Sequence, residues 1–255
     1  MKNRIYVIGM GPGKEEMMTM EALHALEQSD VIVGYTVYIK LLDERFSDKT
    51  LLTTPMRQEE ERCRLCFAEA AKGNKVSLIC SGDAGIYGLA SLMYEVGKEY
   101  PDTDVVVIPG ITAASSGAAV LGAPLNHDFC VISLSDLLTP WEKIKKRLLA
   151  AAEGDFAIAI YNPSSHKRKD YLQKACDILL TVLEPERPCG YVENIGREGT
   201  RAVTCTLGEL RDAEVNMFTT VFVGNRGTEI IGGKLVTKRG YQIEKNTDFC
   251  RDNGR

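Results

Sequence analysis

The sequence lacks a strong excess of either charge and lacks any long apolar run. Its 31 Lys and Arg residues against 35 Asp and Glu residues give a formal net charge of −4, so the cationic surface that nucleic acid requires is not expected. No apolar segment approaches the roughly 18 residues that cross a bilayer. The first residues lead directly into a short apolar strand and not into the core of a signal peptide. We therefore expect a cytoplasmic protein with no nucleic-acid partner and no membrane segment.

The sequence also lacks paired cysteine motifs at zinc-ribbon spacing. Of its eight cysteines, only Cys63 and Cys66 form a CxxC, and that pair lies within a charged helical pattern with no second pair to complete a metal site. Cytoplasmic thiols are normally reduced. We predict that these cysteines are packing residues and that the protein has no metal site.

The composition and the order of short segments predict an α/β protein. The 255 residues, 44% hydrophobic and 26% charged, are typical of a soluble globular chain with one large domain or two lobes. Short runs rich in β-branched residues alternate with segments of helix length, which favours largely parallel sheets. The expected strands are RIYVIG, VIVGY, KVSLICSG, VVVIPG, FCVISL, FAIAIYN, PCGYVEN, RAVTCTL and TTVFVG, and the expected helices are 15–28, 57–72, 87–100, 141–153 and 169–183.

The local composition of the chain changes where a segment rich in Gly, Ala and Ser ends at Pro124-Leu125-Asn126-His127. New strands follow this point. The change predicts an N-terminal α/β lobe over 1–112, a linker helix and loop over 113–127, a C-terminal α/β lobe over 128–240 and a polar tail over 241–255.

The first strand ends in the glycine-rich turn Gly9-Met10-Gly11-Pro12-Gly13. A dinucleotide-binding loop would need glycine at position 14, which is Lys14, and an acid after the second strand, where Val33-Gly34-Tyr35 stands. Pro12 also removes a backbone donor from any phosphate cradle. Taken alone, this turn fits a ligand-facing loop and a structural turn equally well.

Two further strand ends carry small residues that let a ligand approach the backbone. Asp83 in CSGDAGIYG places a charge where α/β folds bind ligands, although a helix N-cap would use the same residue. The run that begins at Thr112 in PGITAASSG suits a helix that packs against a flat ligand, and tight packing on a sheet would explain it almost as well.

Two loops carry basic residues. Lys167 and Arg168 follow the strand end YNP, and Arg197 and Arg201 lie in ENIGREGTR. Arginine suits carboxylate recognition through its planar donor fork. A solvated basic surface is the simpler interpretation of each loop.

Taken in order, these motifs resemble those of the tetrapyrrole methylases, over about residues 4–239. The series is GxGPG, SGDxxIYG, PGITAASS, a YNP strand end and an ENxGR turn. Within that family, VLGAPLNHDF, VISLSDLLTPWE and IAIYNPSSHKRK resemble the enzymes that methylate ring carbon 17 of precorrin-3B or its cobalt form. The resemblance implies a two-lobed α/β fold distinct from Rossmann methyltransferases, S-adenosylmethionine in a cleft between the lobes, a precorrin or cobalt-precorrin substrate, ring contraction coupled to methylation, and a homodimer.

The resemblance also implies roles for individual residues. Asp83 and His127 are candidates for the proton movements of ring contraction, and a turn or packing role for His127 remains open. Lys167, Arg168, Arg197 and Arg201 are candidates for the substrate carboxylates. The implied cofactor contacts are Pro12, Ser81, Gly82, Asp83, Ile86, Thr112, Ala113, Asn162, Gly196 and Thr219, with Asn162 standing where the family often has an apolar residue.

Three alternatives remain at this stage. A related enzyme of the same fold would methylate another precorrin position or make a diphthamide intermediate. A nucleotide-binding oxidoreductase is disfavoured by Lys14 and by the missing acid. A tetrapyrrole carrier would bind the substrate without methyl transfer.

Overall fold

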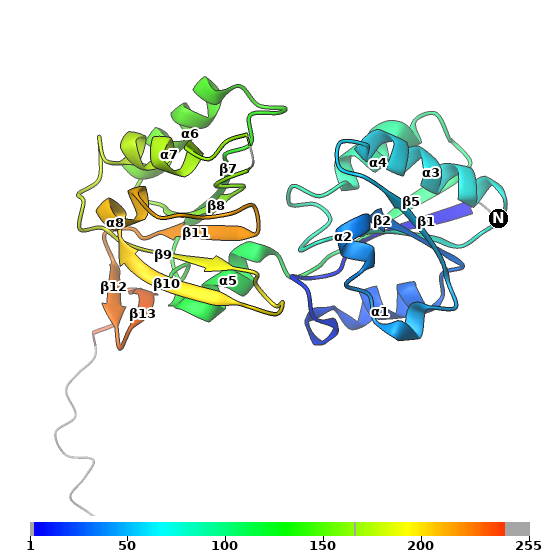
Figure 1. Ribbon diagram of the computed structural model, residues 1–255, viewed down its shortest axis with the longest axis horizontal. Helices are drawn as coiled ribbons and strands as arrows, with labels where there is room; N and C mark the ends of the chain where they lie inside the picture. Colours follow the sequence, from blue (N-terminus) through cyan, green and yellow to red (C-terminus); the bar gives the residue numbers. More distant parts are fainter. Residues whose placement is uncertain (1–2, 166, 243–255) are drawn as a thin grey trace, which may run out of the picture.

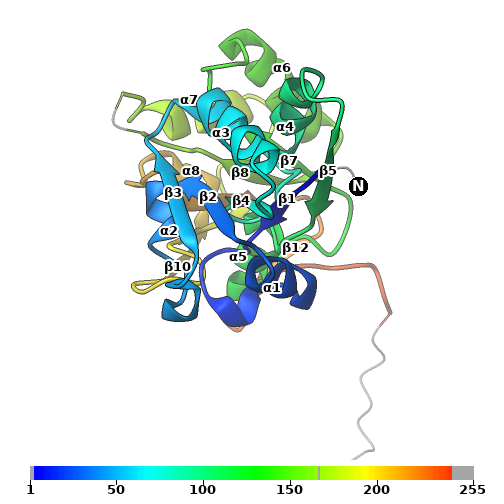
Figure 2. The ribbon, with the colours of Figure 1, turned by 90° about the vertical axis from the view of Figure 1, so that its right-hand side faces the viewer.

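The chain folds into two lobes, each built on its own five-stranded sheet, with a small third sheet beside the second lobe (Figure 1). The computed structural model describes residues 3–165 and 167–242. Figure 2, turned by 90°, shows the first-lobe sheet edge-on with helices on both of its faces. The expected two-lobed α/β fold is confirmed.

The first sheet is entirely parallel, in the order β3-β2-β4-β1-β5. Parallel strands need helical crossovers, and the expected alternation of strand and helix supplies them. All carboxyl ends of the strands therefore meet at one edge, which faces the second lobe (Figure 1). The strands are β1 (Asn3–Gly9), β2 (Val31–Tyr35), β3 (Thr50–Thr54), β4 (Val76–Cys80) and β5 (Thr103–Ile108).

Helices cover both faces of the first sheet because its strands are apolar on both sides. On one face, Phe67 and Met93 pack on Val7 and Leu78. On the other face, a second cluster forms around Phe46. The helical elements are η1 (Glu15–Met17), α1 (Met20–Glu27), α2 (Thr36–Ile39), η2 (Glu44–Phe46), α3 (Glu59–Ala71) and α4 (Ala90–Gly97).

The second sheet is mixed, so the expectation of largely parallel sheets is wrong for this lobe. Only β7 and β8 are parallel, and the β8-β11-β9-β10 pairings are antiparallel. The reason is partly local, since the seven-residue turn 194–200 joins β9 to β10 as a hairpin, which parallel pairing does not allow. The strands are β7 (Phe129–Ser133), β8 (Ala157–Tyr161), β9 (Pro188–Glu193), β10 (Arg201–Thr206) and β11 (Thr219–Val223).

One face of the second sheet packs against α6 (Trp141–Glu153), α7 (Tyr171–Leu179) and α8 (Leu207–Arg211). The other face packs against α5 (Ala113–Leu121). Gly117 lies on the inner side of α5, where a Cβ atom would come within 2.9 Å of Phe222. The run of small residues in α5 thus permits close packing on the sheet, which is the second of the two interpretations that the sequence allowed.

The segment 113–127 contains more regular structure than a linker. It holds α5 and β6 (Gly122–Ala123), and β6 pairs with the hairpin of β12 (Thr228–Ile231) and β13 (Lys234–Thr237). Because α5 packs on the second sheet, we propose that the lobe boundary lies before α5. The sequence expectations missed β3, β6, β12 and β13, which are short or largely exposed. Within residues 3–165 and 167–242, no helix has the length and apolarity of a membrane span.

Candidate functional site

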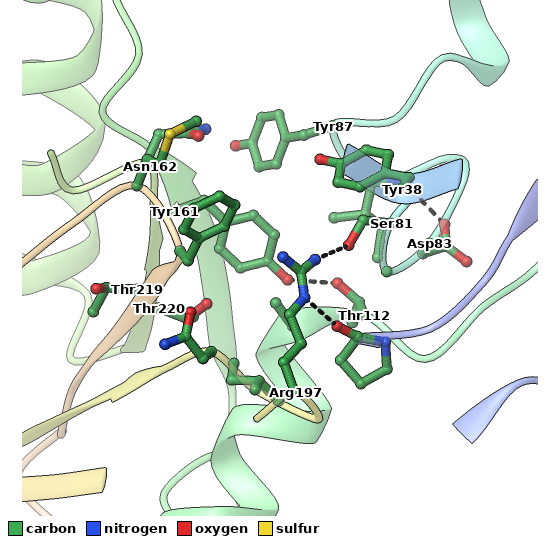
Figure 3. Close-up of a pocket in the computed structure, with 18 residues that line it drawn as sticks. Tyr38, Ser81, Asp83, Tyr87, Thr112, Tyr161, Asn162, Arg197, Thr219 and Thr220 are labelled. Atoms are coloured by element: carbon green, nitrogen blue, oxygen red, sulfur yellow. Dashed lines mark hydrogen bonds between the residues drawn. The ribbon is translucent and has the colours of Figure 1, made fainter. Parts of the chain in front are cut away.

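A cleft opens between the lobes at the carboxyl ends of the first-lobe strands (Figure 3). The cleft encloses about 190 Å³ and is otherwise open to solvent. The lining residues are Pro12, Tyr38, Ser81, Gly82, Asp83, Ile86, Tyr87, Thr112, Ala113, Tyr161, Asn162, Asn194, Ile195, Arg197, Met217, Phe218, Thr219 and Thr220.

The glycine-rich turn after β1 packs backbone to backbone against the loops after β4 and β5. Gly11 and Gly82 exchange two backbone hydrogen bonds of 3.1 and 2.7 Å. A Cβ atom on Gly9 would lie 2.6 Å from the Gly110 nitrogen and 2.7 Å from the Gly82 oxygen, closer than real contacts allow. The turn therefore has a structural role in bringing three strand ends together, and its Pro12 also lines the cleft.

Asp83 holds two of these loops together through its carboxylate. Oδ1 accepts from the backbone N–H groups of Gly85 (2.8 Å) and Ile86 (3.1 Å), and Oδ2 accepts from that of Gly110 (2.9 Å). The interpretation of Asp83 as a helix N-cap is wrong, since α4 begins after Leu89. Because both oxygens already accept hydrogen bonds from the backbone, the geometry favours a loop-holding role over proton transfer.

Tyr161, at the end of β8, caps the start of α5. Its hydroxyl accepts from the Ala114 N–H at 2.6 Å and shares a 2.5 Å hydrogen bond with Thr112 Oγ1. Burial raises the pKa of Tyr161. This contact compensates for Thr112, whose own side chain does not cap the helix. The Tyr161 hydroxyl is thus committed to positioning α5 beside the cleft.

Tyr87 crosses the cleft from the first lobe to the edge strand of the second sheet. Its backbone has φ +55°, a conformation uncommon outside glycine. The hydroxyl donates to the Val131 carbonyl at 3.2 Å and accepts from the Ser133 N–H at 3.1 Å. Ser133 Oγ in turn accepts from Asn162 Nδ2 at 2.9 Å, which leaves the Asn162 amide oxygen available to a ligand.

Arg197 crosses the cleft in the opposite direction, from the turn after β9. Its Nε donates to the Pro12 carbonyl and its Nη2 to Ser81 Oγ, both at 3.1 Å (Figure 3). The guanidinium carbon lies 5.3 Å from the centre of the Phe218 ring. Burial lowers the pKa of Arg197. In the described part of the chain, no carboxylate forms an ion pair with it.

The structure does not bring all the sequence candidates into the cleft. Lys167 is exposed, and Arg168 pairs through Nε with Asp136 Oδ1 at 2.5 Å. Arg201 is 61% exposed beside Glu193. His127 lies before the amino end of β7, whereas the cleft residues Tyr161 and Asn162 lie at the carboxyl end of the neighbouring parallel strand. None of these four candidates lines the cleft, so the expectation that His127 serves the reaction there is not supported.

Most of the expected cofactor contacts, in contrast, do lie in the cleft. All of them line the cleft except Gly196, which lies between the lining residues Ile195 and Arg197. Sequence reasoning missed five large side chains that lie within or near segments joining or ending strands, and nothing in their residue types indicated a role in the cleft. These are Tyr38, Tyr87, Tyr161, Met217 and Phe218. Within the described residues, no three His, Cys, Asp or Glu side chains form a group that could hold a metal.

Comparison with known proteins now defines the class. Residues 4–211 match the family model of the tetrapyrrole (corrin/porphyrin) methylases, and the chain belongs to this family. A probable cobalt-factor III C(17)-methyltransferase of Salmonella typhimurium is 46% identical over 93% of this chain and 99% of its own length. A precorrin-3B C(17)-methyltransferase of a Sinorhizobium species is 37% identical over 91% of this chain and 92% of its own length.

Solved structures agree with this class. A crystal structure of the methyltransferase CobJ has a TM-score of 0.86 at 37% identity, covering 92% of this chain and 100% of that one. A uroporphyrin-III C-methyltransferase of Thermus thermophilus complexed with S-adenosylhomocysteine has a TM-score of 0.65 at 21% identity, covering 87% of this chain and 92% of that one, and shares the fold.

Proposed function

We propose that this protein transfers a methyl group from S-adenosylmethionine to carbon 17 of a precorrin, with contraction of the macrocycle. The observation that carries the proposal is a cleft between the two lobes in a chain 37–46% identical to relatives named as C(17)-methyltransferases. Their names include both cobalt-factor III and precorrin-3B, so the substrate class is a precorrin or its cobalt form.

The cleft residues fit an adenosyl cofactor. Gly82 has φ +69°, and the nearest atom to a Cβ built there lies 3.7 Å away, so the open backbone leaves room for a flat group. On the second-lobe side of the cleft, Asn162, Thr219 and Thr220 provide polar side chains, including the Asn162 amide oxygen. When bound, S-adenosylmethionine supplies a methyl group already activated on a sulfonium, so the protein's residues mainly bind and orient the reactants and exclude water.

Among the four candidate cations, Arg197 is the one that lines the cleft. We therefore restrict the proposed contact with substrate carboxylates to Arg197. Cytoplasmic location and a homodimer are further proposals that depend on the family resemblance, and light scattering of the purified protein tests the dimer.

The proposal is tested by turnover. Cobalt-factor III and precorrin-3B are incubated side by side with the enzyme and a methyl-labelled donor, and products are followed by mass and visible spectra. We expect one labelled methyl at carbon 17 of at least one substrate. S-adenosylhomocysteine should bind with micromolar affinity, about 7–9 kcal/mol. A protein that shows no binding heat at millimolar ligand contradicts the proposal, and label at another carbon favours a related enzyme of the same fold.

A further inference from the structure

Three tyrosines line the cleft, and they differ in what their hydroxyls do (Figure 3). The hydroxyl of Tyr161 caps α5, and that of Tyr87 bonds to the edge of β7. The hydroxyl of Tyr38 has no hydrogen-bond partner among the described residues. Tyr38 is half-buried and lines the cleft, so its free hydroxyl is available to a ligand that enters the cleft.

Tyr38 lies beside two arginines that have no acid partner within the described residues. Arg197 uses two of the five N–H donors of a guanidinium, on Pro12 and Ser81, which leaves three for a ligand. Arg62 is only 4% exposed and donates to the carbonyls of Thr54 and Pro55. The Arg62 guanidinium carbon lies 5.8 Å from the centre of the Tyr35 ring, and that ring packs against Tyr38 at a centroid distance of 5.2 Å. Arg197 lines the same cleft as Tyr38. Burial raises the pKa of Tyr38, and the cations of Arg197 and Arg62 oppose that rise.

Buried cations without an acid partner are costly. The one acid that lines the cleft in the described chain is Asp83, and its two oxygens already accept hydrogen bonds from the backbone. The wall around Tyr38 and Arg197 therefore has free donors and a positive charge that no carboxylate of the described residues pairs with.

We propose that Tyr38 and Arg197 form a carboxylate subsite in the cleft, with Arg62 supplying positive potential from behind. The carboxylate accepts hydrogen bonds from the Tyr38 hydroxyl and from the free N–H groups of Arg197. This inference rests on the proposed function, because both reactants of that function carry carboxylates: the methionine part of the cofactor and the acidic side chains of the tetrapyrrole.

Tyr38→Phe is the decisive variant, because its hydroxyl has no partner to lose in the free protein and the fold should be unaffected. Arg197→Lys keeps the positive charge and removes the planar set of N–H donors that the guanidinium provides. Tyr94→Phe is the matched control, since Tyr94 is an exposed residue of α4 whose hydroxyl donates to the Val105 carbonyl at 3.4 Å, outside the cleft. Calorimetry measures three probes on each protein: S-adenosylhomocysteine, its decarboxylated analogue, and a tetrapyrrole polycarboxylate such as uroporphyrin III.

We expect Tyr38→Phe to lose about tenfold or more in affinity for one carboxylate ligand, as for a hydrogen bond to a charged group. If the cofactor supplies the carboxylate, S-adenosylhomocysteine weakens while its decarboxylated analogue does not. If the tetrapyrrole supplies it, uroporphyrin III alone weakens. Arg197→Lys should weaken the same ligand, and Tyr94→Phe should weaken neither.

Two results overturn the subsite. One is unchanged affinity of Tyr38→Phe for both carboxylate ligands. The other is an equal loss for S-adenosylhomocysteine and its decarboxylated analogue, which indicates general damage to the cleft. Failure of the proposed function is distinguishable, because it appears in the unmodified protein as absence of cofactor binding and of methyl transfer, and that result overturns both proposals.

Discussion

The Tyr87 hydroxyl of the first lobe accepts a hydrogen bond from the backbone N–H of Ser133 in the second lobe, at 3.1 Å. With its donation to the Val131 carbonyl, this contact satisfies two groups on the outer side of β7, the edge strand of its sheet. Through Ser133 Oγ it also connects to Asn162 in the cleft. One side chain thus links the spacing of the lobes to a residue that lines the cleft.

Tyr87→Phe should lower the free energy of unfolding by about 0.5–1.5 kcal/mol per hydrogen bond lost, reduced where water replaces the hydroxyl. Urea denaturation followed by circular dichroism measures the change. Because the ring remains, packing against Tyr161 at a 5.6 Å centroid distance is retained. Equal stability of the variant and the wild type would show that the contact does not hold the lobes.

Gly13→Ala should separate the two loops that meet across the cleft. A Cβ atom at Gly13 would lie 2.8 Å from the Gly196 oxygen and 2.6 Å from Arg197 Cγ, so the loops must move apart. We expect a loss of stability of about 1–3 kcal/mol and about tenfold weaker binding of S-adenosylhomocysteine, measured by thermal melting and calorimetry.

Gly208→Ala is the matched control for that change. Its Cβ atom would meet nothing closer than 3.5 Å, an ordinary contact, and it lies in α8, where alanine is the better helix former. Stability should stay equal or rise, and ligand binding should not change. If both alanine variants behave alike, the close approach of the loops is not what matters.

The first lobe was predictable because buried parallel strands consist of continuous β-branched runs, and VIVGY and KVSLIC have that pattern. β3 was not predicted because its sequence, TLLTT, is largely exposed and lacks the pattern of a buried strand. The mixed direction of the second sheet was not predictable, since strand direction depends on pairings such as β11 with β9 and β8, which the local pattern does not encode.

The candidate site likewise contains features that the local sequence predicts and features that depend on long-range contacts. Small residues at strand ends indicated most of the cleft lining. The contacts of Arg197 could not be predicted from the sequence, because its partners Pro12 and Ser81 lie 185 and 116 positions away along the chain. Likewise, nothing in the sequence distinguishes the free hydroxyl of Tyr38 from the committed ones of Tyr87 and Tyr161.

Replacement of His127 should leave methyl transfer intact. The side chain is half exposed and lies at the end of β7 away from the cleft, with Nδ1 accepting from the Asp128 N–H at 2.9 Å. His127→Ala should therefore keep kcat and KM within about twofold, as expected for a surface change. A fall in kcat of a hundredfold, with the fold intact by circular dichroism, would return His127 to the reaction.

Cys63 and Cys66 should resist thiol reagents in the folded protein. Both are fully buried in α3, and burial raises the pKa of Cys63 to about 12 and that of Cys66 well above its usual value, so little thiolate is present at neutral pH. Ellman's reagent should detect them only after unfolding. A Cys63→Ala, Cys66→Ala variant should keep methyl transfer and show the same native thiol count as the wild type. A lower native count would mean that these thiols are accessible.

Asp136 ties together the loops that follow β7 and β8. Its carboxylate accepts from the Tyr171 hydroxyl at 2.6 Å and pairs with Arg168 at 2.5 Å, and these contacts lower its pKa. A carboxyl whose pKa is lowered by folding stabilises the fold above its unfolded pKa of about 3.9. That stability is lost as the pH falls through the lower, folded value.

The stability advantage of the wild type over Asp136→Asn should therefore be constant above about pH 5 and should shrink as the pH falls below about 4. Urea denaturation at a series of pH values measures it, with Asp128→Asn as the control for loss of a carboxylate that is 84% exposed. Arg168→Ala should lose the part of this pH dependence that comes from the ion pair and should keep tetrapyrrole affinity within about threefold, because its charge is already matched by Asp136. The opposite pattern, unchanged stability with tetrapyrrole affinity reduced tenfold, would mean that Arg168 leaves Asp136 to bind a substrate carboxylate.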